Sequence, residues 1–302
     1  MAVKEMMDAE DVRKEVRKHY GRMASQVGAQ VESSCCAPAG DPEAESSCCS
    51  PSFDTTQLIY DIPEVGELPE EVRSLSAGCG DPVSLAELEP GQTVLDLGSG
   101  GGIDCFLAAQ KVGENGYVIG VDMTTEMLAQ ARTNQAKMGM ENVEFRLGEI
   151  EHLPVADNSV DVILSNCVIN LSPDKPQVFR EAFRVLKSGG RFAVSDIVAD
   201  GPLPEEFERN MAAWAGCVAG AMDQQDYIEE LRRMGFVDVE ISGRQTDPEQ
   251  MAEYLAAQGV ELPEPDQDGK RKPMMNIDGE WKVLEVGDRN PPFSARITAR
   301  KP

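Results

Sequence analysis

A glycine-rich loop directly after an apolar run constrains the fold of this chain more than any other feature. The run at 93–97 is followed at once by Gly98, Gly100 and Gly102. Glycine lets the backbone turn tightly off a strand and approach a ligand closely at the start of the next helix. Open parallel sheets bind ligands beyond the carboxyl ends of such strands. The loop therefore predicts a ligand site at one edge of an α/β sheet.

Strand and helix patterns alternate from this loop onward. Strands are predicted at 93–97, 117–121, 143–147, 160–165, 191–197 and 236–241, and helices near 102–112, 124–138, 174–187 and 223–234. This is βαβ order, which favours a parallel sheet with helices on both faces. Gly189 and Gly190 are predicted to stop the helix at 174–187.

The flanking regions have a different character. Apolar residues at helical spacing predict an amphipathic helix near 9–24, and residues 54–92 have the prolines of loops and short helices. A polar linker is predicted at 262–273, with β-like segments at 281–286 and 294–298 that suggest a small terminal lobe. These patterns predict an N-terminal region at 1–75, a ligand-binding core at 76–200 and a C-terminal region at 201–302.

Charge and hydropathy exclude several classes of partner. Lys and Arg total 28 against 53 Asp and Glu, so the net charge of −25 repels phosphate backbones and anionic lipid. No apolar run is long enough to span a membrane, and the first residues are too charged for a signal peptide. We therefore expect a cytoplasmic protein with no nucleic-acid or membrane partner. Most thiols are reduced there, so the eight cysteines indicate ligands or redox groups.

The spacing around the glycine loop predicts which kind of ligand it binds. Asp122 ends the second strand, twenty residues past Gly102, where a carboxylate can accept hydrogen bonds from ribose hydroxyls. A dinucleotide fingerprint would have its third glycine at position 103, which is Ile103. The pattern therefore favours a nucleoside without a pyrophosphate.

Residues 94–102 resemble the first motif of class I S-adenosylmethionine-dependent methyltransferases. The resemblance implies a Rossmann-like class I methyltransferase sheet and S-adenosylmethionine as methyl donor. It assigns the ribose to Asp122, the adenine to Met123, and the border of the adenine ring to Glu149 and Ile150. The cofactor-binding residues implied in this way are Asp96, Gly98, Ser99, Gly100, Gly102, Asp122, Met123, Glu149, Ile150 and Asn166. The alternative for Glu149 and Ile150 is a solvated loop charge beside a core residue.

Three cysteines stand at separate points that one crevice could bring together. Cys79 precedes the first strand, Cys167 follows the fourth, and Cys217 comes after the fifth. Each alone is more often a small buried hydrophobe than a ligand. Together with the segment 165–175, which contains Asn-Cys-Val-Ile-Asn-Leu, they closely resemble the arsenite methyltransferases over about residues 12–240. That resemblance implies that the three cysteines bind arsenic as substrate and that Asn166 lines the donor side of the crevice.

The chemistry agrees with this resemblance. Thiolates are soft ligands, and three of them can coordinate trivalent arsenic while its lone pair stays free to act as the nucleophile. The chain has only two histidines, His19 and His152, and neither is at a predicted strand end. Scarce histidine fits an acceptor that carries no proton for a general base to remove. The expected reaction methylates arsenite and methylarsenite and so detoxifies arsenic.

The amino-terminal cysteines form a short repeat, Cys35-Cys36 and, thirteen residues later, Cys48-Cys49. In the family, methylated arsenic is thought to return to the trivalent state with electrons from cysteine thiols, and thioredoxin or glutathione then reduces the disulfide. Relatives carry a Cys-Cys pair shortly after a Tyr-Gly, and Cys35, fifteen residues past Tyr20, matches it best. The duplicated pair, Ala77 and Ile103 depart from the family pattern.

Three alternatives remain open at the level of sequence. Structural zinc usually needs Cys-x2–4-Cys spacing, which adjacent pairs do not supply. A methyltransferase for a small organic acceptor such as a quinone would not depend on Cys167. A metalloid-binding or sensing protein would bind arsenite without consuming S-adenosylmethionine.

Overall fold

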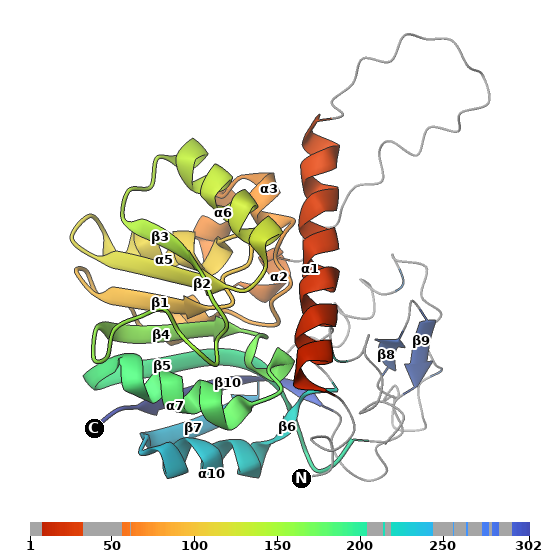
Figure 1. Ribbon diagram of the computed structural model, residues 1–302, viewed down its shortest axis with the longest axis vertical. Coiled ribbons are helices and arrows are strands. Elements are labelled where there is room, and N and C mark those ends of the chain that lie inside the picture. The colour runs from red at the N-terminus through yellow and green to blue at the C-terminus, as the bar shows by residue number, and fades with distance from the viewer. Residues whose placement is uncertain are drawn as a thin grey trace.

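The computed structural model describes residues 8–32, 56–60, 62–203, 214, 219–243, 256, 264, 274–277, 280–283 and 292–302. A central sheet dominates this part of the chain, and helices lie on both of its faces (Figure 1). The predicted α/β class is therefore confirmed. The cysteine pairs at 35–36 and 48–49, Cys217 and nearly all of the predicted linker lie outside the described residues.

The main sheet has the strand order β3-β2-β1-β4-β5-β10-β7, and β6 pairs with β5. The first five strands run parallel, whereas β10 is antiparallel to both of its neighbours. The strands are β1 (Thr93–Leu97), β2 (Tyr117–Asp122), β3 (Val143–Leu147), β4 (Val160–Asn166), β5 (Leu186–Ala199), β6 (Met222–Asp223), β7 (Val237–Gly243) and β10 (Phe293–Arg300). The chain reverses its direction across the sheet between β1 and β4, so β1 and β4 flank a switch point, where α/β sheets bind ligands.

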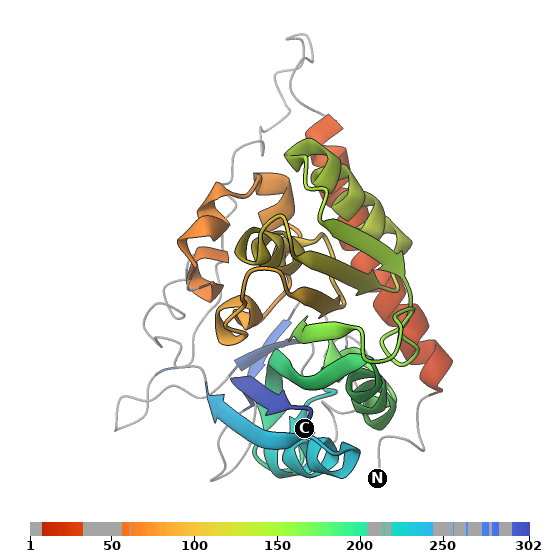
Figure 2. The same ribbon diagram turned by 90° about the vertical axis from the view of Figure 1, so that its left-hand side faces the viewer.

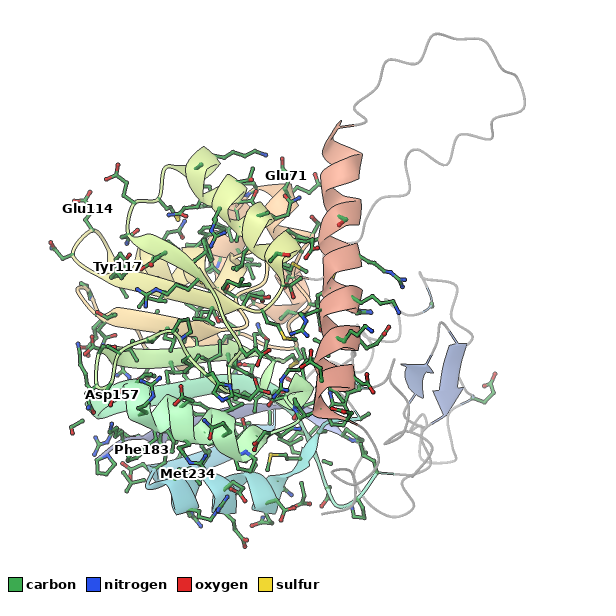
Figure 3. All side chains as sticks on the ribbon, in the orientation of Figure 1. Glu71, Glu114, Tyr117, Asp157, Phe183 and Met234 are labelled. Carbon is green, nitrogen blue, oxygen red and sulfur yellow. A yellow bond between two sulfur atoms is a disulfide. The ribbon has the colours of Figure 1, made fainter. Side chains whose placement is uncertain are left out.

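Two hydrophobic cores cover the two faces of the sheet. One contains Phe179 and Tyr227, and the other contains Phe106 and Leu128. Phe183 and Met234 lie on the side of α7 and α10 (Figure 3). The helices that form these layers are α2 (Thr56–Ile59), η2 (Pro63–Glu67), α3 (Glu70–Arg73), α4 (Pro82–Leu85), α5 (Ile103–Val112), α6 (Thr125–Met138), η3 (Ile169–Leu171), α7 (Lys175–Val185) and α10 (Gln224–Met234).

The predicted helix stop at Gly189 and Gly190 is wrong. Helix α7 ends at Val185, and β5 begins at Leu186 and runs through both glycines. The C-terminus explains the difference, because Gly189 N–H donates to Lys301 O at 2.8 Å and Lys301 N–H donates to Gly190 O at 3.0 Å. The glycines therefore extend the pairing of β5 with the C-terminal residues, which are distant from them in sequence.

The segment predicted as β-like at 294–298 does not form part of a separate lobe. As β10 it lies between β5 and β7 and completes the main sheet. The other predicted terminal segment contributes β9 (Glu280–Val283), which pairs with β8 (Met274–Ile277) in a sheet of two strands. The division into regions at residues 75 and 200 remains a prediction.

Helix α1 (Ala9–Glu32) is longer than the predicted helix and lies beside α6 along one side of the molecule (Figure 2). Val12 and Val16 are buried, and they pack in a cluster with Cys167, Leu171 and Trp214 beyond the end of β4. This helix therefore covers the edge of the sheet where the glycine loop lies. No helix among the described residues is both long enough and apolar enough to cross a membrane.

Candidate active site

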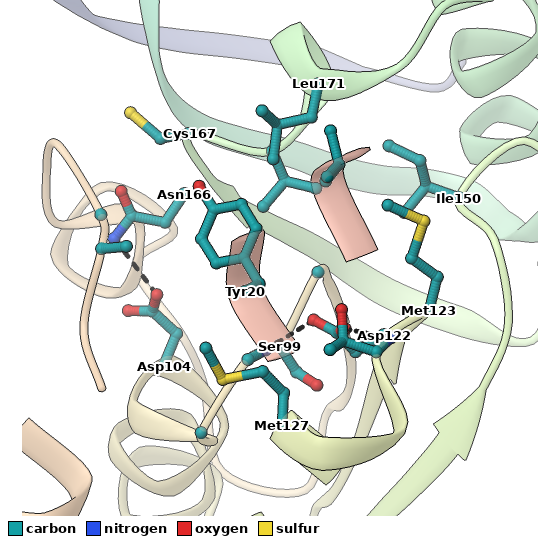
Figure 4. A pocket seen from close by; sticks show the side chains of 18 of the residues that line it. Tyr20, Ser99, Asp104, Asp122, Met123, Met127, Ile150, Asn166, Cys167 and Leu171 are labelled. Carbon is teal, nitrogen blue, oxygen red and sulfur yellow. Dashed lines mark hydrogen bonds between the residues drawn. The ribbon is translucent and has the colours of Figure 1, made fainter. Parts of the chain in front are cut away.

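A cavity opens beyond the carboxyl ends of β1, β2 and β4, at the switch point of the sheet (Figure 4). The sheet side of its wall consists of the loop after β1, the end of β2 and the end of β4. Tyr20 and Val16 of α1 close the opposite side. The residues predicted for the donor that line the cavity are Gly98, Ser99, Gly100, Asp122, Met123, Ile150 and Asn166.

The glycine loop is held by the end of the neighbouring strand. Gly98 N–H and Ser99 N–H both donate to Val121 O, at 2.7 and 3.0 Å. Gly98 has a φ of +70°, and a Cβ there would lie 2.4 Å from the side chain of Val168. Only glycine therefore fits this turn, which brings β1 close to the segment after β4.

Asp122 connects this loop to the nucleoside end of the cavity. Its carboxylate accepts from Gly100 N–H at 2.9 Å and from Thr124 N–H at 2.7 Å. Burial raises the pKa of Asp122, and these backbone donors act in the opposite direction. Each carboxylate oxygen can accept more than one hydrogen bond, so Asp122 keeps capacity for ribose hydroxyls.

The lining fits a nucleoside methyl donor. Met123 and Ile150 give an apolar wall on one side of the cavity, as adenine requires, and Asp122 lies next to them (Figure 4). Ser99 Oγ is buried and has no hydrogen-bond partner within the protein. A polar atom without a partner on the wall of a cavity indicates a polar ligand, because burying such an atom alone costs free energy.

Three residues predicted for the cofactor do not line the cavity. Asp96 lies beneath the loop, where it accepts a hydrogen bond from Cys105 Sγ at 3.2 Å and burial raises its pKa to about 7. Gly102 is the N-cap residue of α5 and has a φ of +95°. Glu149 forms ion pairs with Arg13 and Arg17 of α1, with nitrogen–oxygen distances of 3.6 and 3.3 Å. Asp96 and Gly102 thus support the loop, and Glu149 binds the covering helix.

Cys79 and Cys167 are bonded to one another although they are 88 positions apart in the sequence. Their sulfurs form a disulfide and their Cα atoms are 5.9 Å apart. Cys167 lines the cavity and is only 4% exposed. The sequence predicts reduced thiols, whereas this structure contains the oxidised pair. Cys105 is buried and forms no disulfide.

The turn after β4 places the Cys167 side chain. Cys167 has a φ of +59°, in the left-handed region that non-glycine residues seldom adopt. Its N–H donates to Ser195 O of β5 at 2.8 Å. Strain of this kind is typical of functional sites, where the surrounding structure holds a side chain in place.

Asn166 holds the loop that carries Cys79. Its Oδ1 accepts from the backbone N–H groups of Cys79 at 2.9 Å and Gly80 at 3.2 Å, and its Nδ2 donates to Gly80 O at 2.8 Å. A Cβ on Gly78 would lie 2.4 Å from the same side chain. Asn166 was predicted for the donor side of the crevice, and the structure also places it under the cysteine loop.

A second buried network fixes the segment after Cys167. Asp196 is fully buried and accepts from Asn170 Nδ2 at 2.8 Å, and burial raises the pKa of this carboxyl to about 7. Trp214 Nε1 donates to Leu171 O at 3.1 Å. The turn that contains Cys167 is therefore anchored both to β5 and to the region that precedes α10.

Comparison with known proteins identifies the family. A family model described as a methyltransferase domain matches residues 88–235. The chain is 44% identical over 279 residues to the arsenite methyltransferase of Halobacterium salinarum, covering 86% of this chain and 68% of the relative. The chain belongs to the arsenite methyltransferase family.

Two further relatives of the family extend this comparison. The arsenite methyltransferase of Aquipseudomonas alcaligenes is 39% identical over 230 residues, which are 74% of this chain and 61% of that protein. The crystal structure of CrArsM, an arsenic(III) S-adenosylmethionine methyltransferase from Chlamydomonas reinhardtii, matches with a TM-score of 0.57 and 33% identity, over 78% of this chain and 71% of the other. The chain is therefore an S-adenosylmethionine-dependent methyltransferase by family, and it spans about two thirds of the length of its relatives.

The cavity of this family member also has lining residues that the sequence analysis did not predict. They include Tyr20 of α1, Tyr60 after α2, Asp104 in the first turn of α5 and Met127 of α6. Asp104 could have been found from its position directly behind the glycine loop. Tyr60 carried no signal, because it precedes β1 by more than thirty residues in an irregular region. The described residues contain no cluster of three or more His, Cys, Asp or Glu that could bind a metal ion.

Proposed function

We propose that this protein transfers methyl groups from S-adenosylmethionine to trivalent arsenic held by cysteine thiolates. One observation carries the proposal: Cys167, which lines the same cavity as Gly98, Gly100 and Asp122, has its sulfur bonded to that of Cys79. The bound donor supplies an electrophilic methyl group on a sulfonium. A donor site and two soft ligands side by side suit methyl transfer to a thiophilic acceptor.

Cys217 is proposed as the third ligand, on grounds of chain connectivity. Trp214 is hydrogen-bonded to Leu171, and a Cβ on Gly220 would lie 2.0 Å from Asn170 O. Cys217 is three residues from both of these anchors. Three residues of extended chain span at most about 11 Å, and this length allows Cys217 to reach toward the turn that contains Cys167.

The arsenic must be bound by the reduced cysteines, because a disulfide has no thiolate to offer. Reduction of the Cys79–Cys167 bond leaves two thiols on neighbouring backbone segments. The loop held by Asn166 and the turn held by Asp196 then fix the direction from which arsenic faces the donor. Such orientation lowers the barrier without any proton transfer.

The transfer itself needs no general base. The arsenic lone pair forms the new carbon–arsenic bond while the carbon–sulfur bond of the donor breaks, and its electron pair stays on sulfur as S-adenosylhomocysteine. The arsenic becomes formally pentavalent. Two cysteine thiols then supply two electrons, lose two protons and form a disulfide, which returns arsenic to the trivalent state. Thioredoxin or glutathione is the proposed reductant of that disulfide.

The length of chain between the cavity and each amino-terminal pair limits which of these cysteines can take part in the reduction of arsenic. Tyr20 lines the cavity, and α1 continues for twelve residues to Glu32, or about 18 Å along the helix. Cys35 is three residues further, a reach of at most about 11 Å. Cys49 precedes Thr56 by seven residues, a reach of at most about 25 Å, and Tyr60 just beyond it lines the cavity. As long as α1 stays helical to Glu32, the chain lets the Cys48-Cys49 pair approach the cavity from farther away than the Cys35-Cys36 pair.

Serine substitutions separate these possibilities. We expect Cys48→Ser with Cys49→Ser to slow repeated turnover on arsenite more than Cys35→Ser with Cys36→Ser. If both double variants turn over arsenite at the wild-type rate, the amino-terminal pairs take no part in the reduction of arsenic. A larger defect in the 35–36 variant would restore Cys35 as the exchanging residue.

Mass-resolved arsenic speciation tests the proposed function. Reduced protein, arsenite, S-adenosylmethionine and thioredoxin should yield mono- and dimethylated arsenic together with S-adenosylhomocysteine. A parallel reaction offers a quinone in place of arsenite. Methylation of the quinone by both wild type and Cys167→Ser, with arsenite left unchanged, would overturn the proposal in favour of an organic acceptor. Tight arsenite binding without any S-adenosylhomocysteine would indicate a sensor.

A further inference from the structure

Asp104 has a carboxyl oxygen that is buried at the cavity and has no partner. The side chain is 5% exposed and lines the cavity, and its Oδ1 makes no hydrogen bond within the protein. The other oxygen, Oδ2, accepts from Asn166 Nδ2 at 3.2 Å, and the Tyr60 hydroxyl also hydrogen-bonds this carboxyl group. Since a buried acceptor without a donor is costly, the arrangement indicates that a ligand supplies the missing donor.

The position of Asp104 along the cavity identifies which part of a ligand reaches it. Met123 and Ile150 lie on one side of the cavity and Asn166 and Asp104 on the opposite side, with Ser99 and Asp122 between them (Figure 4). A donor with its adenine at the first side and its ribose at Asp122 extends its amino-acid end toward Asp104. Cys167 lies at this same end of the cavity (Figure 4).

The charge of the lining suits a cationic group. Asp104, Asp122 and Glu151 are the acids that line the cavity, and within the described part of the chain Arg13 is the only lining lysine or arginine. Arg13 is itself paired with Glu149 and Glu151. Burial, with Asp96 nearby, raises the pKa of Asp104, and a positively charged ligand beside it would favour the ionised carboxylate.

We propose that Asp104 binds the α-ammonium group of the methyl donor through its unpartnered Oδ1. The ammonium has N–H donors that complete this acceptor, whereas a sulfonium has none. A charge-assisted hydrogen bond in a buried site is also stronger than a neutral one. This assignment rests on S-adenosylmethionine as the donor.

Asn166 connects Asp104 to the loop that carries Cys79. The same amide that donates to Asp104 Oδ2 also donates to Gly80 O, and its Oδ1 accepts from Cys79 N–H. Tyr60 OH accepts from Asn166 Nδ2 at 3.2 Å in the same cluster. The donor's amino-acid end and the Cys79 loop thus share one hydrogen-bonded network.

Calorimetric titration with two ligands tests the proposal. S-adenosylhomocysteine has the ammonium but no sulfonium charge, and its desamino analogue lacks the ammonium. Wild type should bind the desamino analogue about 10- to 100-fold more weakly, as expected for loss of a charge-assisted hydrogen bond. Asp104→Asn should bind both ligands with nearly equal affinity, at the level that wild type shows for the analogue.

Asp122→Asn is the matched control, because it also neutralises a carboxyl on the cavity wall. It should weaken both ligands equally and keep the wild-type ratio. If Asp104→Asn does not fold, judged by circular dichroism, the smaller Asp104→Ser variant takes its place, and the wild-type ratio is informative by itself. A wild-type ratio near one, or a ratio in Asp104→Asn equal to that of wild type, would overturn this inference alone. Failure of wild type to bind S-adenosylhomocysteine would overturn the donor assignment as well.

Discussion

The two ends of the cavity are built in different ways. At the donor end, the loop after β1 is held by the end of β2, its direct neighbour in the sheet. At the cysteine end, Cys79 precedes β1 and Cys167 follows β4, and Asn166 binds the backbone of Cys79 and Gly80 across 87 and 86 residues of sequence. The donor end therefore depends on regular strand order, and the cysteine end on a few long-range side-chain contacts. The cysteine end can be damaged while donor binding persists.

The most severe test of this contrast is Cys167→Ser. We expect no detectable methylation of arsenite, because a serine hydroxyl is a poor ligand for trivalent arsenic. The affinity for S-adenosylhomocysteine should stay at the wild-type level, since the glycine loop and Asp122 are untouched. Cys105→Ser is the control, as Cys105 is a buried cysteine outside the cavity lining, and it should retain methylation. Speciation and calorimetry on the same preparations give both results.

Asn166→Ala should have the next largest effect. It leaves the part-buried N–H groups of Cys79 and Gly80 without their acceptor, at a cost of about 1–3 kcal/mol. We expect methylation to fall about 10- to 100-fold if this cost appears in the transition state. The Cys79–Cys167 disulfide should also re-form more slowly after reduction, which thiol trapping measures. An unchanged rate of disulfide formation would show that Asn166 does not position Cys79.

The difference between the two ends also explains what could be predicted from sequence. The alternation of strands and helices, the donor loop and Asp122 follow from local patterns, namely apolar periodicity, glycines after an apolar run and a carboxylate at the next strand end. The approach of Cys79 to Cys167 has no local signal and came from family resemblance. The predicted start of β5 was wrong because the residue that pairs with this part of the strand, Lys301, is more than a hundred residues away. Tyr60 and the pairing of Arg13 with Glu149 depend on the same kind of long-range packing.

A buried carboxyl lies beneath each end of the cavity, Asp96 at the donor end and Asp196 at the cysteine end. We expect a change of pH to alter the contribution of both carboxyls to stability in the same direction. Burial raises the pKa of both Asp96 and Asp196 to about 7. Because the folded state favours the protonated form, their contribution to stability is complete below the unfolded pKa near 4 and is lost as the pH rises toward 7. For Asp196 the loss is roughly 4 kcal/mol. Asp196→Asn should therefore flatten the free energy of unfolding between pH 4 and 7, measured by urea denaturation. A slope identical to that of wild type would contradict this explanation.

Arg13→Ala should have the smallest effect. Arg13 lies 3.5 Å from Glu151 and 3.6 Å from Glu149, and partly exposed ion pairs contribute about 0.2–1 kcal/mol each. We expect a few-fold loss of S-adenosylhomocysteine affinity, because α1 covers the cavity less firmly, and a weaker salt dependence than in wild type. Lys18→Ala is the control, since Lys18 pairs with Glu15 of the same helix. Equal effects of the two variants would indicate a general charge effect.

The central claim is that arsenic receives its methyl group while the reduced cysteines hold it at the donor cavity. Single-turnover arsenic speciation, with one equivalent each of arsenite and S-adenosylmethionine, tests it on two preparations of the same protein. In one the Cys79–Cys167 disulfide is intact, and in the other it has been reduced and the reductant removed. The account predicts methylated arsenic from the reduced protein and none from the oxidised protein. Equal methylation by both would contradict it.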